Sequence, residues 1–156
     1  MPDDFDLLSI DIDRNDYWVL KALLEGTGAG TASYRPRVIV AEINSHIPAL
    51  EARTVAYDAN AQWDGTTYGG ASLLAMTKLL ELHRFSLVYC ESHGVNCFFV
   101  RADILGLDGG PDPGAQLRTL DDYFAVHRLY KPPNFFGEGR RHPEPQPQTA
   151  LEWVWV

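Results

Sequence analysis

Apolar runs and amphipathic stretches alternate in the first part of the chain. Residues 5–12, Phe-Asp-Leu-Leu-Ser-Ile-Asp-Ile, form a short and nearly continuous apolar run, which is typical of a parallel strand buried on both faces. Residues 37–43, Arg-Val-Ile-Val-Ala-Glu-Ile, are rich in β-branched side chains and predict a second buried strand. Between them, an apolar stripe over residues 15–24 predicts a helix that ends at Gly26. Together the three elements predict a right-handed βαβ unit with two parallel strands.

The next part of the pattern predicts a long loop, a second helix and a hairpin. Residues 44–70 are polar and aromatic, and loops of this length in compact domains usually carry function. Residues 72–83 are too apolar for an exposed helix, so we expect this helix to pack on the sheet. Two β-rich runs, 85–91 and 95–101, are separated by Ser-His-Gly and predict an antiparallel hairpin.

The composition changes after these elements. Residues 108–156 contain a linker rich in glycine and proline, a predicted short helix over 120–130 and a Pro-rich arm over 131–148. We therefore divide the chain into an α/β region, 1–107, and this C-terminal region. The final segment, 153–156, is expected to wrap over the surface rather than to form a second domain.

Net charge excludes several classes of partner. The chain has 13 Lys and Arg residues against 21 Asp and Glu residues, a net charge of −8. This balance disfavours nucleic acids and anionic membranes as partners. The basic run Arg-Arg-His at 140–142 lies in the Pro-rich arm, and we interpret it as solvated surface.

Signals of export and of metal binding through cysteine are missing from the sequence. The first residues lack the basic and apolar regions of a signal peptide, and no stretch approaches about 18 apolar residues. Cys90 and Cys97 form no Cys-x-x-Cys motif and have no histidine pair at zinc spacing, so neither a disulfide framework nor a zinc site is indicated. We expect a cytoplasmic protein with both cysteines reduced.

Carboxylates gather where the two predicted strands end. Asp11 and Asp13 follow the first strand, and Glu42 closes the second. Open α/β sheets bind ligands at this edge, and clustered carboxylates need a cation, a proton or a positive partner to relieve their repulsion. We therefore take Asp11, Asp13 and Glu42 as candidate catalytic residues, and Asp11 and Asp13 as candidate metal ligands. The alternative is that these residues have structural roles. Arg14 or backbone amides would neutralise Asp13, and Asp16 would be stabilised as an acidic residue in the first turn of the helix.

The polar and aromatic loop supplies candidate substrate-binding residues. An amide at the end of the second strand suits hydroxyl binding, a nearby histidine suits proton transfer near pH 7, and aromatic rings suit a planar or sugar-like substrate. The alternative is that these side chains only fasten the loop to the core. The candidates are Asn44, His46, Tyr57, Trp63 and Tyr68.

Several known motifs are excluded. The acidic run 11–15 is not an EF-hand, because Asp16 stands where that loop needs glycine and Ala22 where it needs glutamate. The glycine-rich run 25–30 follows a predicted helix and leads to a strand, whereas a cofactor turn needs the opposite order. Signatures of serine hydrolases, P-loop proteins and zincins do not occur.

Four segments together resemble the C-terminal portion of FkbM-type S-adenosylmethionine-dependent methyltransferases. They are Leu8–Trp18, Val40–Asn44, Gly70–Leu73 and Gly94–Arg101, and the resemblance extends from Phe5 to Arg101. The resemblance implies a partial Rossmann-like methyltransferase sheet, with two parallel strands and an antiparallel hairpin.

Within the first segment, Asp11, Asp13 and Asp16 match the acidic turn of that family, with Arg14 in place of its glycine. The resemblance places Asp11 beside the site of methyl transfer, as a base or as a ligand of a divalent cation such as magnesium. The strands that bind S-adenosylmethionine in such enzymes would precede Phe5. We therefore expect this chain alone to bind that cofactor weakly or not at all.

Three functions follow as hypotheses. The first is O-methyl transfer to a hydroxyl, performed when a partner or a second copy completes the site. The second is a non-catalytic interaction module or truncated paralogue. The third is a metal-dependent hydrolase or lyase that uses Asp11, Asp13 and Glu42.

The strand at 5–12 would have an unpaired edge, since its neighbour in the family's sheet is missing. We expect this edge to be covered by a second copy in a homodimer, by the chain's own segment 153–156, or by another polypeptide.

Overall fold

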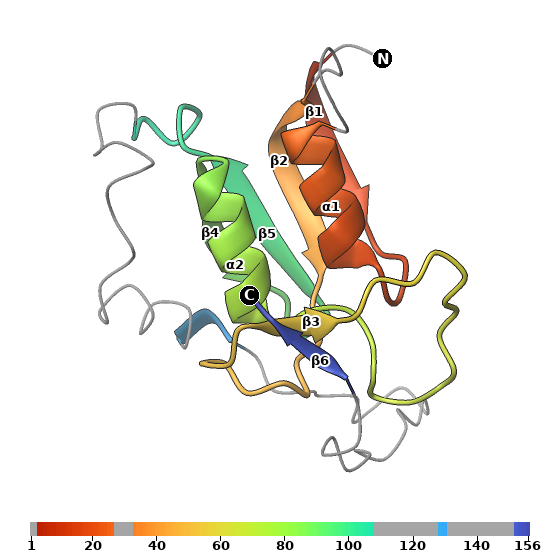
Figure 1. Ribbon diagram of the computed structural model, residues 1–156. Coiled ribbons are helices and arrows are strands. Elements are labelled where there is room, and N and C mark those ends of the chain that lie inside the picture. The colour runs from red at the N-terminus through yellow and green to blue at the C-terminus, as the bar shows by residue number, and fades with distance from the viewer. Residues whose placement is uncertain (1–2, 27–32, 108–127, 131–151) are drawn as a thin grey trace.

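The computed structural model describes residues 3–26, 33–107, 128–130 and 152–156 (Figure 1). This described part of the chain is mixed α/β, with one four-stranded sheet, one two-stranded sheet and two helices. The elements are β1 (Asp4–Ile10), α1 (Asp16–Glu25), β2 (Arg35–Glu42), β3 (Arg53–Val55), α2 (Leu73–Leu82), β4 (Phe85–Cys90), β5 (Asn96–Arg101) and β6 (Trp153–Trp155).

The main sheet has the order β1-β2-β5-β4. Strands β1 and β2 are parallel, β5 is antiparallel to β2, and β4 is antiparallel to β5. The predicted βαβ unit and hairpin are therefore confirmed. The hairpin enters the sheet through its second strand, so β5 and not β4 lies beside β2.

Local sequence explains where α1 ends and where α2 begins. Helix α1 ends at Gly26, whose φ of 75° suits glycine and whose amide donates to the carbonyl of Ala22. This confirms the interpretation of Gly26 as a helix end, while the rest of the glycine-rich run, 27–32, lies outside the described residues. Helix α2 begins after Ser72, whose hydroxyl accepts from the amide of Ala75 at 3.0 Å.

The core lies between the sheet and the two helices, which cover the same face of the sheet (Figure 1). Its fully buried side chains include Leu20 from α1, Met76 and Leu80 from α2, Ile39 from β2 and Phe99 from β5. Burying each such side chain contributes about 1.5–3 kcal/mol to folding. No described helix is long and apolar enough to span a membrane.

Strand β1 differs from the prediction. It ends at Ile10 rather than at residue 12, and it is an edge strand in which only Ile10 is buried and Leu7 is 57% exposed. The prediction of burial on both faces was wrong for the described chain, because β1 has one strand neighbour and its apolar side chains alternate between the helix-covered face and the open face.

The C-terminal segment docks on the loop and not on β1. Strand β6 pairs antiparallel with β3, with Val55 opposite Trp153 and Arg53 opposite Trp155. The guanidinium of Arg53 lies over the ring of Trp153, 4.8 Å from its centroid. The option that segment 153–156 covers the edge of β1 is therefore wrong. The predicted linker, most of the helix at 120–130 and the Pro-rich arm lie outside the described residues.

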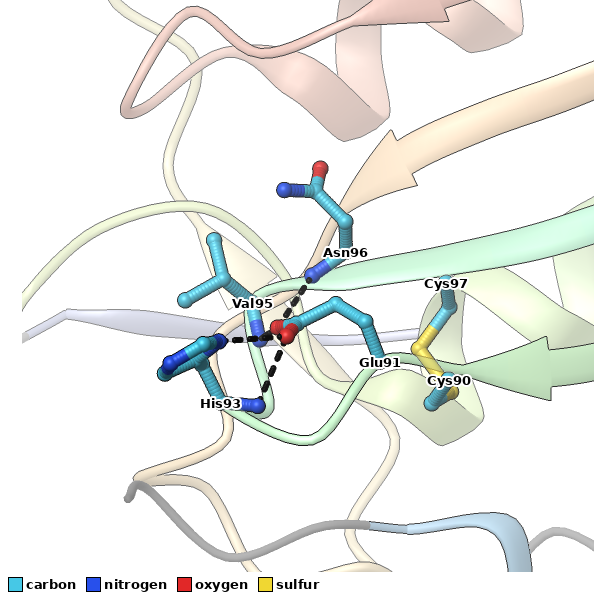
Figure 2. Close-up of a disulfide and its surroundings, with 6 residues drawn as sticks. All are labelled: Cys90, Glu91, His93, Val95, Asn96 and Cys97. Carbon is cyan, nitrogen blue, oxygen red and sulfur yellow. Dashed lines mark hydrogen bonds and ion pairs between the residues drawn. A yellow bond between two sulfur atoms is a disulfide. The ribbon is translucent and has the colours of Figure 1, made fainter. Parts of the chain in front are cut away.

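The expectation of reduced cysteines is also wrong. Cys90 and Cys97 form a disulfide across the hairpin (Figure 2). They stand opposite each other in the register of β4 and β5, with their Cα atoms 4.1 Å apart. The sequence separation of seven residues is what a turn between two facing positions requires.

Reduction of this disulfide is expected to destabilise the hairpin. Loss of a disulfide that closes so short a loop should lower the free energy of unfolding by about 2 kcal/mol, because the unfolded chain regains conformational freedom. Urea unfolding with and without a reductant should show this difference in the free energy of unfolding. In the double variant Cys90→Ala/Cys97→Ala the reductant should have no effect, and an equal midpoint for oxidised and reduced wild type would contradict the expectation.

Candidate functional site

A cavity of about 530 Å³ lies at the carboxyl ends of β1 and β2. One wall is formed by Asp11, Asp13 and Glu42, a second by the loop over 63–70, and a third by the turn between β4 and β5, 91–96. The cavity thus occupies the edge of the sheet at which open α/β folds bind ligands.

The three candidate carboxylates converge there. Asp11, Asp13 and Glu42 each present an oxygen, and these oxygens lie within 4.8 Å of one another. Asp11 and Asp13 are exposed, whereas Glu42 is half-buried. Among the described residues, none of the three forms an ion pair, and Arg14 instead donates to the carbonyl of Gln62. The structure therefore gives no support to neutralisation of Asp13 by Arg14.

The backbone holds Asp13 in an uncommon conformation. Its φ is 66°, in the left-handed region that aspartate tolerates better than most residues. Its amide donates to Oε2 of Glu42 at 3.2 Å, which ties the turn after β1 to the end of β2. Its carbonyl oxygen lies only 2.7 Å from the place where a Cβ on Gly69 would stand. Gly69 therefore lets the long loop approach the acidic turn closely.

Burial and mutual repulsion both act on the carboxylates. Burial raises the pKa of Glu42 to about 8, and the neighbouring charges of Asp16, Asp11 and Asp13 add to this. Asp16 is fully buried, and burial also raises its pKa. One Asp16 oxygen accepts from the amide of Ile12 at 2.9 Å, while the other has no hydrogen-bond partner. The region therefore gains stability from any proton or cation that it binds.

Two further predicted residues, Asn44 and His46, line the same cavity. The amide nitrogen of Asn44 donates to the carbonyls of Thr67 and Gly69, both at 2.8 Å. Its side-chain oxygen accepts from the amide of His46 at 3.0 Å. Asn44 thus fastens the loop that closes the cavity. These contacts agree with the structural interpretation of Asn44 rather than with substrate binding.

The structure brings one of the three predicted aromatic residues to the cavity. Trp63 lines it, and its indole nitrogen donates to the carbonyl of Thr66 at 2.7 Å. Tyr57 is 60% exposed and lies outside the cavity lining. Tyr68 also lies outside the lining, and its hydroxyl donates to the carbonyl of Glu152 at 2.7 Å while its ring contacts Trp153. Tyr68 therefore anchors β6, and an aromatic clamp of all three residues is not formed.

Sequence reasoning missed a Glu–His pair on the hairpin turn. Oε2 of Glu91 accepts from the amide of His93 at 2.7 Å and lies 2.8 Å from Nδ1 of its ring (Figure 2). Oε1 accepts from the amides of Val95 and Asn96. Burial alone would raise the pKa of Glu91, but these hydrogen bonds outweigh it and lower the pKa. A carboxylate two residues before a histidine in a short turn was the available signal.

The pair is held on a rigid support. Glu91 follows Cys90 directly, and the disulfide closes the other end of the turn at Cys97 (Figure 2). The carbonyl of Val95 accepts from the amide of Ile43 at 2.7 Å, which joins the turn to the end of β2. His93 is thus fixed on one wall of a cavity that has the acidic residues on another.

Comparisons with protein-family models, with curated proteins and with solved structures give no match.

The variant Glu42→Gln is expected to change how stability depends on pH. Because the pKa of Glu42 rises from 4.5 to about 8 on folding, its contribution to stability is present at low pH and is lost as pH rises through about 8. The variant stays neutral, so its free energy of unfolding should lie close to that of wild type near pH 5 and exceed it by about 2 kcal/mol near pH 9. This is less than the roughly 5 kcal/mol that the full pKa shift would give, because Glu42 is only half-buried and water screens its charge. Urea unfolding at both pH values measures this. The matched control is Glu25→Gln on the exposed face of α1. If wild type were less stable than Glu42→Gln by the same free energy of unfolding at both pH values, titration of Glu42 would not be the cause.

Proposed function

We propose that this chain is the cation- and substrate-binding half of an O-methyltransferase-like protein. The observation that carries the proposal is the convergence of Asp11, Asp13 and Glu42 on a cavity at the ends of two parallel strands. Oxygen ligands of this kind suit a hard divalent cation such as magnesium. The unpartnered buried oxygen of Asp16 adds negative charge to the same region.

The topology supports the methyltransferase-like part of the proposal. The chain order of strand, helix, strand, long loop, helix and antiparallel hairpin is the order that the resemblance implies. Strand β1 lies at the open edge of the sheet, where a further strand would continue it.

The described residues do not fit S-adenosylmethionine. Binding of its adenosyl group at a helix N-terminus would need a glycine-rich turn between a strand and a helix. The turn from β1 to α1 instead carries Asp11, Asp13 and Arg14. We therefore assign the methyl donor to another polypeptide.

The chain's own residues have distinct roles in this proposal. Asp11, Asp13 and Glu42 would hold the cation, which acts as a Lewis acid and lowers the pKa of a bound hydroxyl. His93, oriented by the Glu91 carboxylate, would accept the hydroxyl proton. Trp63 would cover one side of the substrate. Asn44 and Gly69 would keep the loop against the acidic turn.

A second candidate function keeps the cation and omits methyl transfer. A metal-dependent hydrolase or lyase would use the same three carboxylates, and it is favoured because the turn that carries Asp11 and Asp13 is acidic and not glycine-rich. A non-catalytic interaction module is favoured by a different observation, the exposed edge of β1.

Titration calorimetry with Mn²⁺ tests the cation site. Wild type should bind Mn²⁺ and gain thermal stability from it, whereas Asp11→Asn/Asp13→Asn should lose at least tenfold in affinity. Because Glu42 must lose its proton to bind the cation, the affinity should rise by up to tenfold per pH unit below about pH 8. The exposed-face variant Glu25→Gln should bind like wild type.

Equal Mn²⁺ affinity in the double variant and wild type would show that Mn²⁺ binds away from Asp11 and Asp13. That result would contradict the proposal. S-adenosylmethionine added to the same samples should produce no binding heat, and micromolar binding by the chain alone would overturn the assignment of the methyl donor to another polypeptide.

A further inference from the structure

Strand β6 lies outside the cavity lining but contacts one cavity wall through Tyr68. The hydroxyl of Tyr68 donates to the carbonyl of Glu152 at 2.7 Å, and its ring lies 4.9 Å from the ring of Trp153, edge to face. Tyr68 directly precedes Gly69, which lines the cavity. The docking of β6 therefore helps to hold the loop over 63–70 in place.

Tyr68 also contacts the acidic turn, through Arg14. The guanidinium of Arg14 lies over the Tyr68 ring, 5.1 Å from its centroid. Arg14 follows Asp13 directly, yet its Nη1 donates to the carbonyl of Gln62 at 3.4 Å. Ring contacts thus lead from Trp153 on β6 to the residue beside the carboxylates.

Arg14 is held only weakly in this position. A donor–acceptor distance of 3.4 Å is long, since such bonds are usually about 2.7–3.2 Å. Its Nε is buried and has no hydrogen-bond partner among the described residues, which costs free energy. Asp11 and Asp13 stand on the same turn and form no ion pair with any described residue. A second arrangement, with Arg14 on these carboxylates, would satisfy both sides.

We propose that docking of β6 keeps the cation site open by holding Arg14 against Tyr68. When β6 leaves β3, Tyr68 loses its anchor. Arg14 then turns to the carboxylates of Asp11 and Asp13 and neutralises them. A divalent cation must compete with Arg14 for these oxygens, so it binds more weakly. This proposal rests on the cation site proposed above and names its regulation.

Strand β6 is suited to reversible docking beside β3 (Figure 1). It pairs over three residues only, and Trp155 is 66% exposed. Two cationic side chains add to the pairing: Arg53 lies over both tryptophan rings, and Nζ of Lys78 donates to the carbonyl of Val156 at 3.1 Å. Short, partly exposed segments of this kind open at a lower free energy than the core does. The docked and open states differ in the partner of Arg14, and this difference couples β6 to the cation site.

Titration calorimetry with Mn²⁺ measures the coupling in the whole chain. Trp153→Ala removes the ring that contacts Tyr68, and the affinity for Mn²⁺ should fall about fivefold. Trp155→Ala is the matched control, because its ring lies on the same strand and contacts Arg53 but not Tyr68. The control should bind Mn²⁺ like wild type. Circular dichroism should show that both variants keep the wild-type fold.

Arg14→Gln separates this mechanism from a merely structural role of Trp153. Without the guanidinium nothing competes for the carboxylates, so adding Trp153→Ala to Arg14→Gln should leave the Mn²⁺ affinity unchanged. An equal loss of affinity with and without Arg14 would overturn the proposal. Equal affinity of wild type and Trp153→Ala would overturn it too.

Tyr68→Phe tests the same contact with a smaller change. It keeps the ring between Arg14 and Trp153 and removes only the hydrogen bond to the carbonyl of Glu152. The affinity for Mn²⁺ should fall about twofold. If Trp153→Ala does not fold, this variant decides, and an unchanged affinity would overturn the proposal.

The NMR signal of the Arg14 Nε–H group reports the position of Arg14 without metal. In Trp153→Ala this signal should move downfield, because Nε gains a carboxylate acceptor, whereas in Trp155→Ala it should stay as in wild type. An unchanged signal in Trp153→Ala would overturn the proposal. Mn²⁺ binding that does not respond to Trp153→Ala would overturn this proposal alone, whereas no Mn²⁺ binding by wild type would overturn the cation site as well.

Discussion

The parallel pairing of β1 with β2 is the constraint on which the site depends. Parallel strands end at the same edge of a sheet, so the residues that follow β1 and those that close β2 must meet there. Asp11 and Asp13 therefore reach Glu42, although about thirty residues separate them in the sequence. The pairing in turn depends on α1, which crosses from the end of one strand to the start of the other and buries Leu20 in the core.

The rest of the cavity is built by contacts that lock two irregular segments to that edge. The amide group of Asn44 holds the loop at Thr67 and Gly69, and the loop approaches the carbonyl of Asp13 because Gly69 has no side chain. On the other side, the disulfide and the four hydrogen bonds to Glu91 fix the hairpin turn. Polar contacts and one covalent bond therefore hold both segments in place around the cavity.

The main elements were predictable because the hydrophobic residues of each follow a clear pattern along the sequence. Helices α1 and α2 and strands β2, β4 and β5 were all expected within a few residues. Strands β3 and β6 were not, because three residues carry no readable period and they pair across about a hundred positions. The same limit applies to the Cys90–Cys97 bond, which becomes evident only from the register of β4 and β5. It also applies to β1, whose composition indicates burial on both faces although β2 alone pairs with it among the described strands.

The charged carboxylates of the acidic cluster disfavour folding, although the same carboxylates suit the binding of a cation. Packing of the βαβ unit forces Glu42 and Asp16 into a region where burial and neighbouring carboxylates disfavour their charged forms. A purely structural strand end would gain stability by replacing these groups, since removing like charges relieves repulsion at no cost in packing. A cation gives the opposite result, because its attraction to each carboxylate turns the same proximity into affinity. Binding of a proton or a cation therefore relieves the repulsion between these carboxylates and stabilises the folded chain.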